Sequence, residues 1–103
     1  MHVFAQEGSG SGTVEIEHVG SWNNKDLLFF YTSSRTSYAE CNTYKGRWVL
    51  DLSTSLGKAQ YSLLLAAQSA SKEVAVAGKG NCDLYGASEA VRWVGYKVDY
   101  TNK

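Results

Sequence analysis

Three groups of residues have types and spacings that could support catalysis. Glu15 and Glu17 lie two positions apart, so a strand would place both carboxylates on one face, as an acid/base pair requires. His18 falls on the other face beside apolar residues, where a packed histidine is the simpler interpretation. A Gly-Lys-Gly stretch at 78–80 lacks the spacing of a phosphate loop and precedes no expected helix. A solvated strand face explains the glutamates more simply, and we expect no enzyme.

A segment rich in tyrosine and hydroxyl groups is the better functional lead. Aromatic residues make up 13% of the chain, which is more than a small core can hide. Tyrosine and tryptophan combine a flat apolar face with a polar tip, which suits stacking on sugar rings or anchoring a protein interface. We predict a glycan site at Tyr31, Ser33, Ser34, Arg35 and Tyr38, in which the arginine would bind sugar hydroxyls or a sialate carboxylate between two tyrosines. A solvated hairpin loop is the alternative for this segment.

The charge balance argues against nucleic acid or an anionic membrane surface as the partner. Ten Lys and Arg residues are matched by ten Asp and Glu residues, so the formal net charge is zero. Nonspecific binding to either polyanion normally requires a clear excess of basic residues. The sequence also contains no hydrophobic run long enough to insert across a membrane.

The two cysteines, Cys41 and Cys82, are predicted to form one disulfide. Neither has a second cysteine or a histidine at metal-ligand spacing, so we expect no zinc site and no cofactor. An even cysteine count in a small domain is typical of an oxidising compartment, which indicates a secreted or periplasmic protein. Two unrelated buried thiols are the alternative.

Hydrophobic periodicity predicts five strands and one helix. Alternation or a continuous apolar run predicts strands at 13–22, 27–32, 47–52, 73–79 and 90–100. The run at 27–32 is typical of a strand that is covered on both faces. Helical spacing of apolar residues begins near residue 58 and ends near residue 70, after N-cap candidates that include Thr54. Residues 33–42 are polar and loop-like.

The element order predicts a mainly β domain. Five strands with one helix between the third and fourth match an OB-fold-like five-stranded barrel, and an open α+β sheet is the alternative. Residues 7–12, Glu-Gly-Ser-Gly-Ser-Gly, have the composition of a flexible linker. We therefore expect a flexible leader at 1–12 and a single domain at 13–103.

The C-terminal half resembles small secreted bacterial proteins similar to the B subunit of subtilase cytotoxin and the pertussis-like AB5 toxins. The matching pieces, in order, are Trp48-x-Leu50-Asp51, Gly57-Lys58, Leu63-Leu64-Leu65-Ala66-Ala67, Val74-x-Val76, Gly80-x-Cys82 and Glu89-x-Val91-x-x-Val94. The resemblance implies an OB barrel, export and paired cysteines. In the toxins, five copies form a ring that binds sialylated or other cell-surface glycans and carries a separate catalytic A subunit. No sugar-binding residue can be transferred by motif.

From these features we expect an exported module that binds a cell-surface glycan and forms a homo-oligomer, with a pentamer and a catalytic A subunit implied by the resemblance. The alternative is an exported structural or protein-interaction domain with no sugar site.

Overall fold

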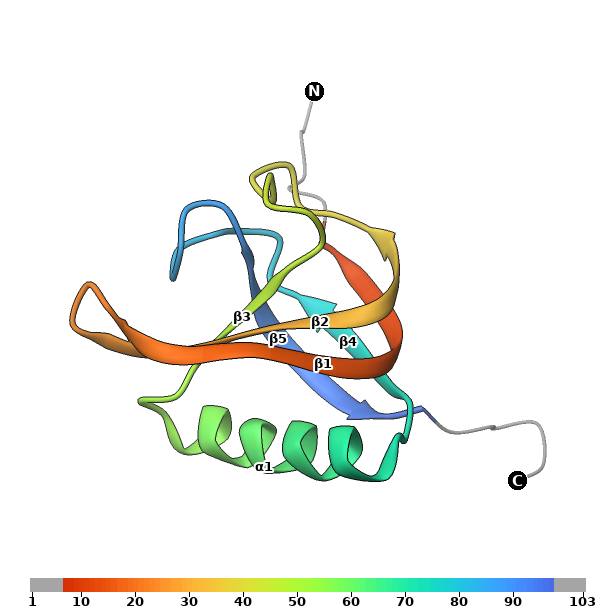
Figure 1. Ribbon diagram of the computed structural model, residues 1–103. Coiled ribbons are helices and arrows are strands. Elements are labelled where there is room, and N and C mark those ends of the chain that lie inside the picture. The colour runs from red at the N-terminus through yellow and green to blue at the C-terminus, as the bar shows by residue number, and fades with distance from the viewer. Residues whose placement is uncertain (1–6, 98–103) are drawn as a thin grey trace.

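The computed structural model describes residues 7–97 of the chain. Its elements follow the predicted order of three strands, one helix and two strands, as Figure 1 shows. They are β1 (Ser9–Trp22), β2 (Lys25–Ser37), β3 (Trp48–Asp51), α1 (Ser55–Ala70), β4 (Val74–Gly78) and β5 (Glu89–Tyr96). The predicted last strand was longer, and its positions 98–100 lie outside the described residues, as does the leader segment 1–6.

The five strands form one sheet that closes on itself in the order β1-β2-β3-β5-β4. Closure occurs where the first residues of β1 pair with β4, from Ser9 opposite Ala77 to Gly12 opposite Val74. β3 and β5 are parallel, and the other neighbouring strands are antiparallel. The prediction of a mainly β, OB-fold-like domain with a helix between the third and fourth strands is confirmed.

Two apolar clusters lie on opposite faces of β2. Leu28 and Phe30 point into the barrel, where they meet the fully buried Trp48 and the helix residue Leu64. Leu27 and Phe29 point outward and pack under the β4–β5 loop. The apolar run of β2 is therefore covered on both faces, as its lack of alternation predicted. Each fully buried side chain of this kind contributes about 1.5–3 kcal/mol to folding.

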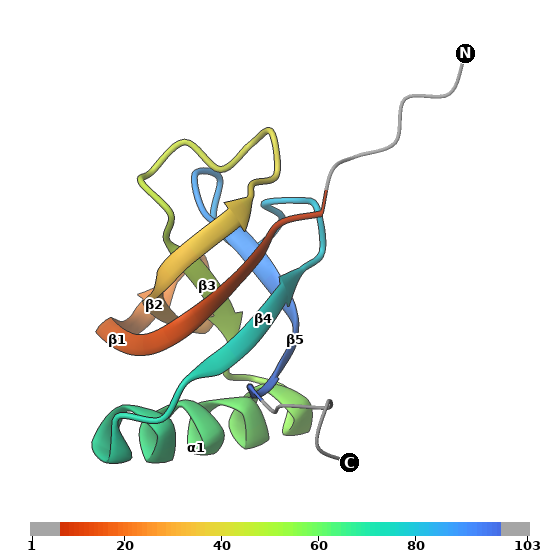
Figure 2. The ribbon, with the colours of Figure 1, turned by 90° about the vertical axis from the view of Figure 1, so that its right-hand side faces the viewer.

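Helix α1 lies across one end of the barrel (Figure 2). It begins earlier than predicted, because the side chain of Thr54 accepts a hydrogen bond from the Gly57 backbone nitrogen at 2.8 Å and caps the first turn. It ends at Ala70, because the next residue, Ser71, has a left-handed backbone conformation (φ 53°) that terminates the helical hydrogen-bond pattern. Among residues 7–97, the structure shows no helix that is long and apolar enough to cross a membrane.

The expectation that residues 7–12 form a flexible leader is wrong. β1 begins at Ser9, and Gly8, Gly10 and Gly12 are buried between β2 and β4. A Cβ added at Gly10 would lie 2.7 Å from Thr32 Oγ1, so glycine permits the close approach of the strands. The regular alternation of glycine and serine in this segment has the period of a strand. The prediction failed because it relied on the linker-like composition of the segment and not on this period.

Candidate functional site

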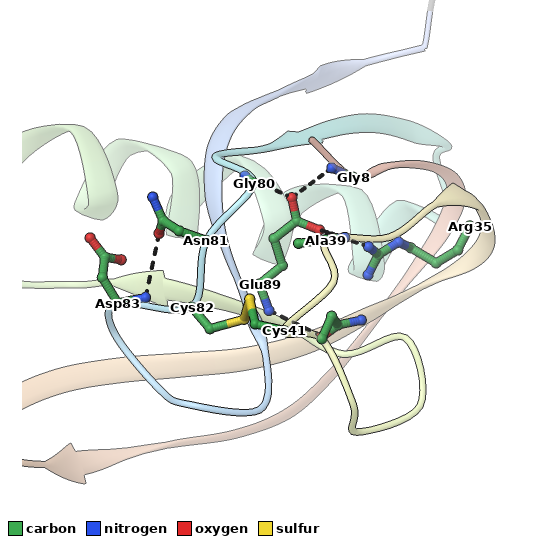
Figure 3. Close-up of a disulfide and its surroundings, with 10 residues drawn as sticks. Gly8, Arg35, Ala39, Cys41, Gly80, Asn81, Cys82, Asp83 and Glu89 are labelled. Carbon is green, nitrogen blue, oxygen red and sulfur yellow. Dashed lines mark hydrogen bonds and ion pairs between the residues drawn. A yellow bond between two sulfur atoms is a disulfide. The ribbon is translucent and has the colours of Figure 1, made fainter. Parts of the chain in front are cut away.

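A disulfide joins the two loops at the barrel end away from α1. Cys41 in the β2–β3 loop (38–47) bonds to Cys82 in the β4–β5 loop (79–88), with 6.1 Å between their Cα atoms, so the predicted pairing is confirmed (Figure 3). Backbone hydrogen bonds of 3.1 Å from Thr43 and Tyr44 to the Ala87 carbonyl oxygen also connect the loops. The disulfide and these hydrogen bonds therefore hold the two loops together.

Glu89 occupies the interior of this end of the barrel. Its carboxylate accepts hydrogen bonds from the backbone nitrogens of Gly8 at 2.6 Å, Ala39 at 3.0 Å and Gly80 at 3.1 Å. It also pairs with Arg35 Nη2 at 3.0 Å (Figure 3). A buried carboxylate is tolerated because these donors replace its hydration.

The structure overturns the role predicted for Arg35. Its side chain is only 4% exposed, and its guanidinium carbon lies 3.7 Å from the Trp48 ring centroid and 4.5 Å from that of Tyr38. Burial lowers the pKa of Arg35, and the Glu89 carboxylate acts in the opposite direction. The arginine is therefore already paired inside the fold and does not present its charge to a sialate between two tyrosines.

The other predicted glycan residues fall into two places. Tyr31 and Ser33 line one shallow pocket of about 220 Å³, whereas Tyr38 covers Arg35 at the barrel end and Ser34 is exposed on β2. The segment is also not a hairpin loop, because β2 continues to Ser37. Its polar residues pair with the glycine–serine start of β1, for example Ser9 with Ser37. The prediction of a loop failed because the sequence alone did not show that residues 9–12 form the neighbouring strand.

A continuous set of aromatic side chains lies on the outer side of the sheet. We define the aromatic face as the rings of His18, Trp22, Phe29, Tyr31, Tyr44 and Tyr85 together with Arg47. Tyr31 is connected to the others through Glu17, which bonds to Tyr31 and pairs with Arg47. Tyr85 contacts both Trp22 and Phe29 edge-on, with ring centroids 5.2 and 5.1 Å apart.

The ring centroids of His18 and Phe29 lie 4.6 Å apart, but the His18 side chain is 52% exposed. A register shift after Ile16 places His18 opposite the outward-facing Phe29, so it does not share the apolar face of Val14 and Ile16 that the sequence predicted for it.

Arg47 lies at the centre of the aromatic face. Its guanidinium carbon is 4.1 Å from the Tyr44 centroid and 4.4 Å from the Phe29 centroid. Its Nη1 pairs with Glu17 at 2.8 Å and its Nε donates to Ser88 Oγ at 3.0 Å. Contacts between a desolvated guanidinium and an aromatic ring contribute about 2 kcal/mol. No role was predicted for Arg47 from the sequence, although the apolar Val49 two positions later indicated that this face of the strand is covered.

The polar groups of the aromatic face are ordered by the same contacts. Partial burial would raise the pKa of Glu17, but hydrogen bonds from Arg47 and Tyr31 outweigh it and hold the pKa below its ordinary value. Burial, together with the bond to Glu17, raises the pKa of Tyr31. At neutral pH the Tyr31 hydroxyl therefore donates to an ionised Glu17, over 3.1 Å.

The aromatic face combines exposed ring surface with these ordered polar groups. Trp22 is 51% exposed at the β1–β2 turn, and Tyr44 is also exposed. The outer side of β1–β3, between the β1–β2 and β4–β5 loops, corresponds to the surface on which OB-folds bind oligosaccharides and oligonucleotides. Over residues 7–97, no group of three or more His, Cys, Asp and Glu side chains is arranged to hold a metal ion.

No protein-family model, curated protein or solved structure matches this chain.

Proposed function

We propose that this protein is an exported module that binds a cell-surface glycan through the aromatic face. The observation that carries the proposal is the half-exposed Trp22 ring, which is supported by Tyr85. Tyr85 in turn lies 5.2 Å from the Arg47 guanidinium that pairs with Glu17. A sugar ring presents apolar C–H faces and hydroxyl donors together, so it is recognised by a flat ring with nearby acceptors. The zero net charge makes the other common OB-fold ligand, a nucleic acid strand, a poorer fit.

The disulfide supports the proposed compartment. Disulfides persist in oxidising environments and are rare where thiols are kept reduced. The Cys41–Cys82 bond is therefore compatible with a secreted or periplasmic protein.

The resemblance to AB5 toxin B subunits implies that several copies of this chain assemble. We propose a homo-oligomer, with a ring of five as the first stoichiometry to test and a catalytic A subunit as its candidate partner. Native mass spectrometry of the non-reduced protein checks this directly. A mass five times that of the monomer would support the ring, and a monomer would contradict it.

The second candidate function is an exported protein-interaction or structural domain without a sugar site. Apolar side chains exposed outside the aromatic face favour it, notably Trp93 on β5 and Leu56 and Leu65 on α1. Such surface is typical of contacts with another protein.

A glycan array distinguishes the two functions when it is probed with three proteins. They are the wild type, Trp22→Ala and the matched control Trp93→Ala. Trp93 is a suitable control because both tryptophans are 51% exposed and only Trp22 belongs to the aromatic face. We expect Trp22→Ala to weaken binding at least about ten-fold, as the loss of an interface anchor does. We expect Trp93→Ala to bind like the wild type. A folded wild-type protein that binds no glycan would contradict the sugar function and favour the second candidate.

A further inference from the structure

A β-bulge opens a pocket next to the aromatic face. Ser11 pairs with Ser34 and Val14 with Thr32, so Gly12 and Thr13 together oppose Ser33 alone. Gly12 has a φ of 112°, and the Thr13 backbone nitrogen donates to Ser33 Oγ at 3.0 Å. Bulges change the direction of side chains at functional sites.

This pocket has a chemistry suited to a single sugar unit. Thr13, Glu15, Tyr31, Thr32 and Ser33 line its volume of about 220 Å³, below the roughly 300–1,000 Å³ of sites for larger molecules. Glu15 pairs across the strands with Tyr31, whose hydroxyl also bonds to Glu17. Tyr31 therefore belongs to both the pocket and the aromatic face, and the two surfaces are continuous.

The charged side chain that lines the pocket is the carboxylate of Glu15, and the two nearby arginines are already paired with other glutamates. Arg47 is paired with Glu17, and Arg35 is paired with Glu89 inside the barrel. Lys45 approaches the aromatic face at the edge, with its Nζ 5.8 Å from the Tyr44 centroid. Glu15 and Lys45 are both exposed to solvent, but only Glu15 lines the pocket and can contact a sugar unit bound there.

We propose that the pocket is a second sugar subsite and that Glu15 makes it selective for an uncharged sugar unit, an inference that rests on the proposed glycan-binding function. An ionised carboxylate only accepts hydrogen bonds, so Glu15 accepts from the hydroxyls of a neutral sugar and repels an acidic one. Phe29 and Ser33 are four residues apart on β2, which corresponds to about 13 Å along a strand. That length exceeds one sugar ring, so a ligand that contacts both surfaces has to be an oligosaccharide.

An array that holds neutral oligosaccharides beside their sialylated counterparts tests this specificity. We expect neutral chains of two or more units to bind about two- to five-fold more strongly than the sialylated forms, the effect of one charged contact that is screened by solvent. Glu15→Gln should weaken binding of the neutral chains and bring the two classes closer together. Lys45→Gln, the control, should leave both classes unchanged, and circular dichroism should show that both variants are folded.

The outcomes separate this inference from the proposed function. Preferential binding of sialylated chains that is lost in Trp22→Ala would keep the glycan function and overturn the role of Glu15. The same role is overturned if Lys45→Gln abolishes binding while Glu15→Gln has no effect. Absence of binding to every glycan would overturn the proposed function, and this inference with it.

Discussion

Arg35 Nη2 and Glu89 Oε1 lie 3.0 Å apart, with side chains that are 4% and 0% exposed. The pair closes the end of the barrel away from α1. The three backbone donors to Glu89 connect it to Gly8, which directly precedes β1, and to both disulfide-linked loops. This ion pair is therefore placed to stabilise the fold rather than to bind a ligand.

Removing Glu89 should destabilise the protein strongly. In Glu89→Ala the Arg35 charge stays buried without its partner, which typically costs about 3–5 kcal/mol of unfolding free energy. Glu89→Gln keeps the shape of the side chain and should cost less. Chemical denaturation measures both, with Glu73→Gln as control, since Glu73 pairs with Lys97 at the surface over 3.6 Å and should lose under about 1 kcal/mol. Similar losses in Glu89→Ala and the control would contradict the assigned role.

The disulfide should contribute substantially to stability. The bond joins cysteines that are 41 positions apart, and closing a loop of that length stabilises a fold by about 4 kcal/mol in the chain-entropy model. We expect Cys82→Ser to lower the melting temperature by many degrees under non-reducing conditions. Reducing the wild type should produce a similar loss. A variant that melts within a degree or two of the wild type would show that the bond does not stabilise the fold.

Gly12 should not tolerate a side chain. Its φ of 112° is a conformation that other residues rarely adopt, and an added Cβ would collide with the Ser33 hydroxyl. We expect Gly12→Ala to cost about 1–3 kcal/mol. Gly20→Ala is the matched control on the same strand, because a Cβ there meets nothing within 4 Å. Denaturant titration should place the control within about 0.5 kcal/mol of the wild type. A tolerated Gly12→Ala would argue against the bulge and its pocket.

Glu17 should make stability depend on pH in the acid range. Burial opposes ionisation of Glu17, but bonds from Arg47 and Tyr31 lower its pKa below the ordinary 4.5. The stabilisation from ionised Glu17 is fully present above the pKa that this carboxyl has in the unfolded chain. It is lost as the pH falls through the lower pKa that the carboxyl has in the folded protein. From about pH 5 to pH 3, the unfolding free energy of the wild type should therefore fall more steeply than that of Glu17→Gln. Other carboxyl groups are common to both proteins, so equal slopes would contradict this prediction.

The sequence alone determined the order and type of the elements, because the direction of side chains along a strand or helix is a local property with a fixed period. The apolar run of Leu27–Phe30 already showed a strand covered on both faces, and the even cysteine count already indicated the Cys41–Cys82 bond. The glycine–serine alternation before Thr13 also contained a strand signal, although composition pointed to a linker.

The tertiary structure alone decided where the charges and the candidate site lie. Arg35 and Glu89 are 54 residues apart, and Arg47 and Glu17 are 30 apart, so no local pattern pairs them. Their pairing depends on strand register, on the bulge opposite Ser33 and on closure of the sheet by the first residues of β1. A shift of one residue in register turns a side chain to the other face of its strand. For that reason Arg35 is held inside the barrel and Arg47 within the aromatic face. The sequence shows Arg35 only in a polar segment and Arg47 only at the start of a predicted strand.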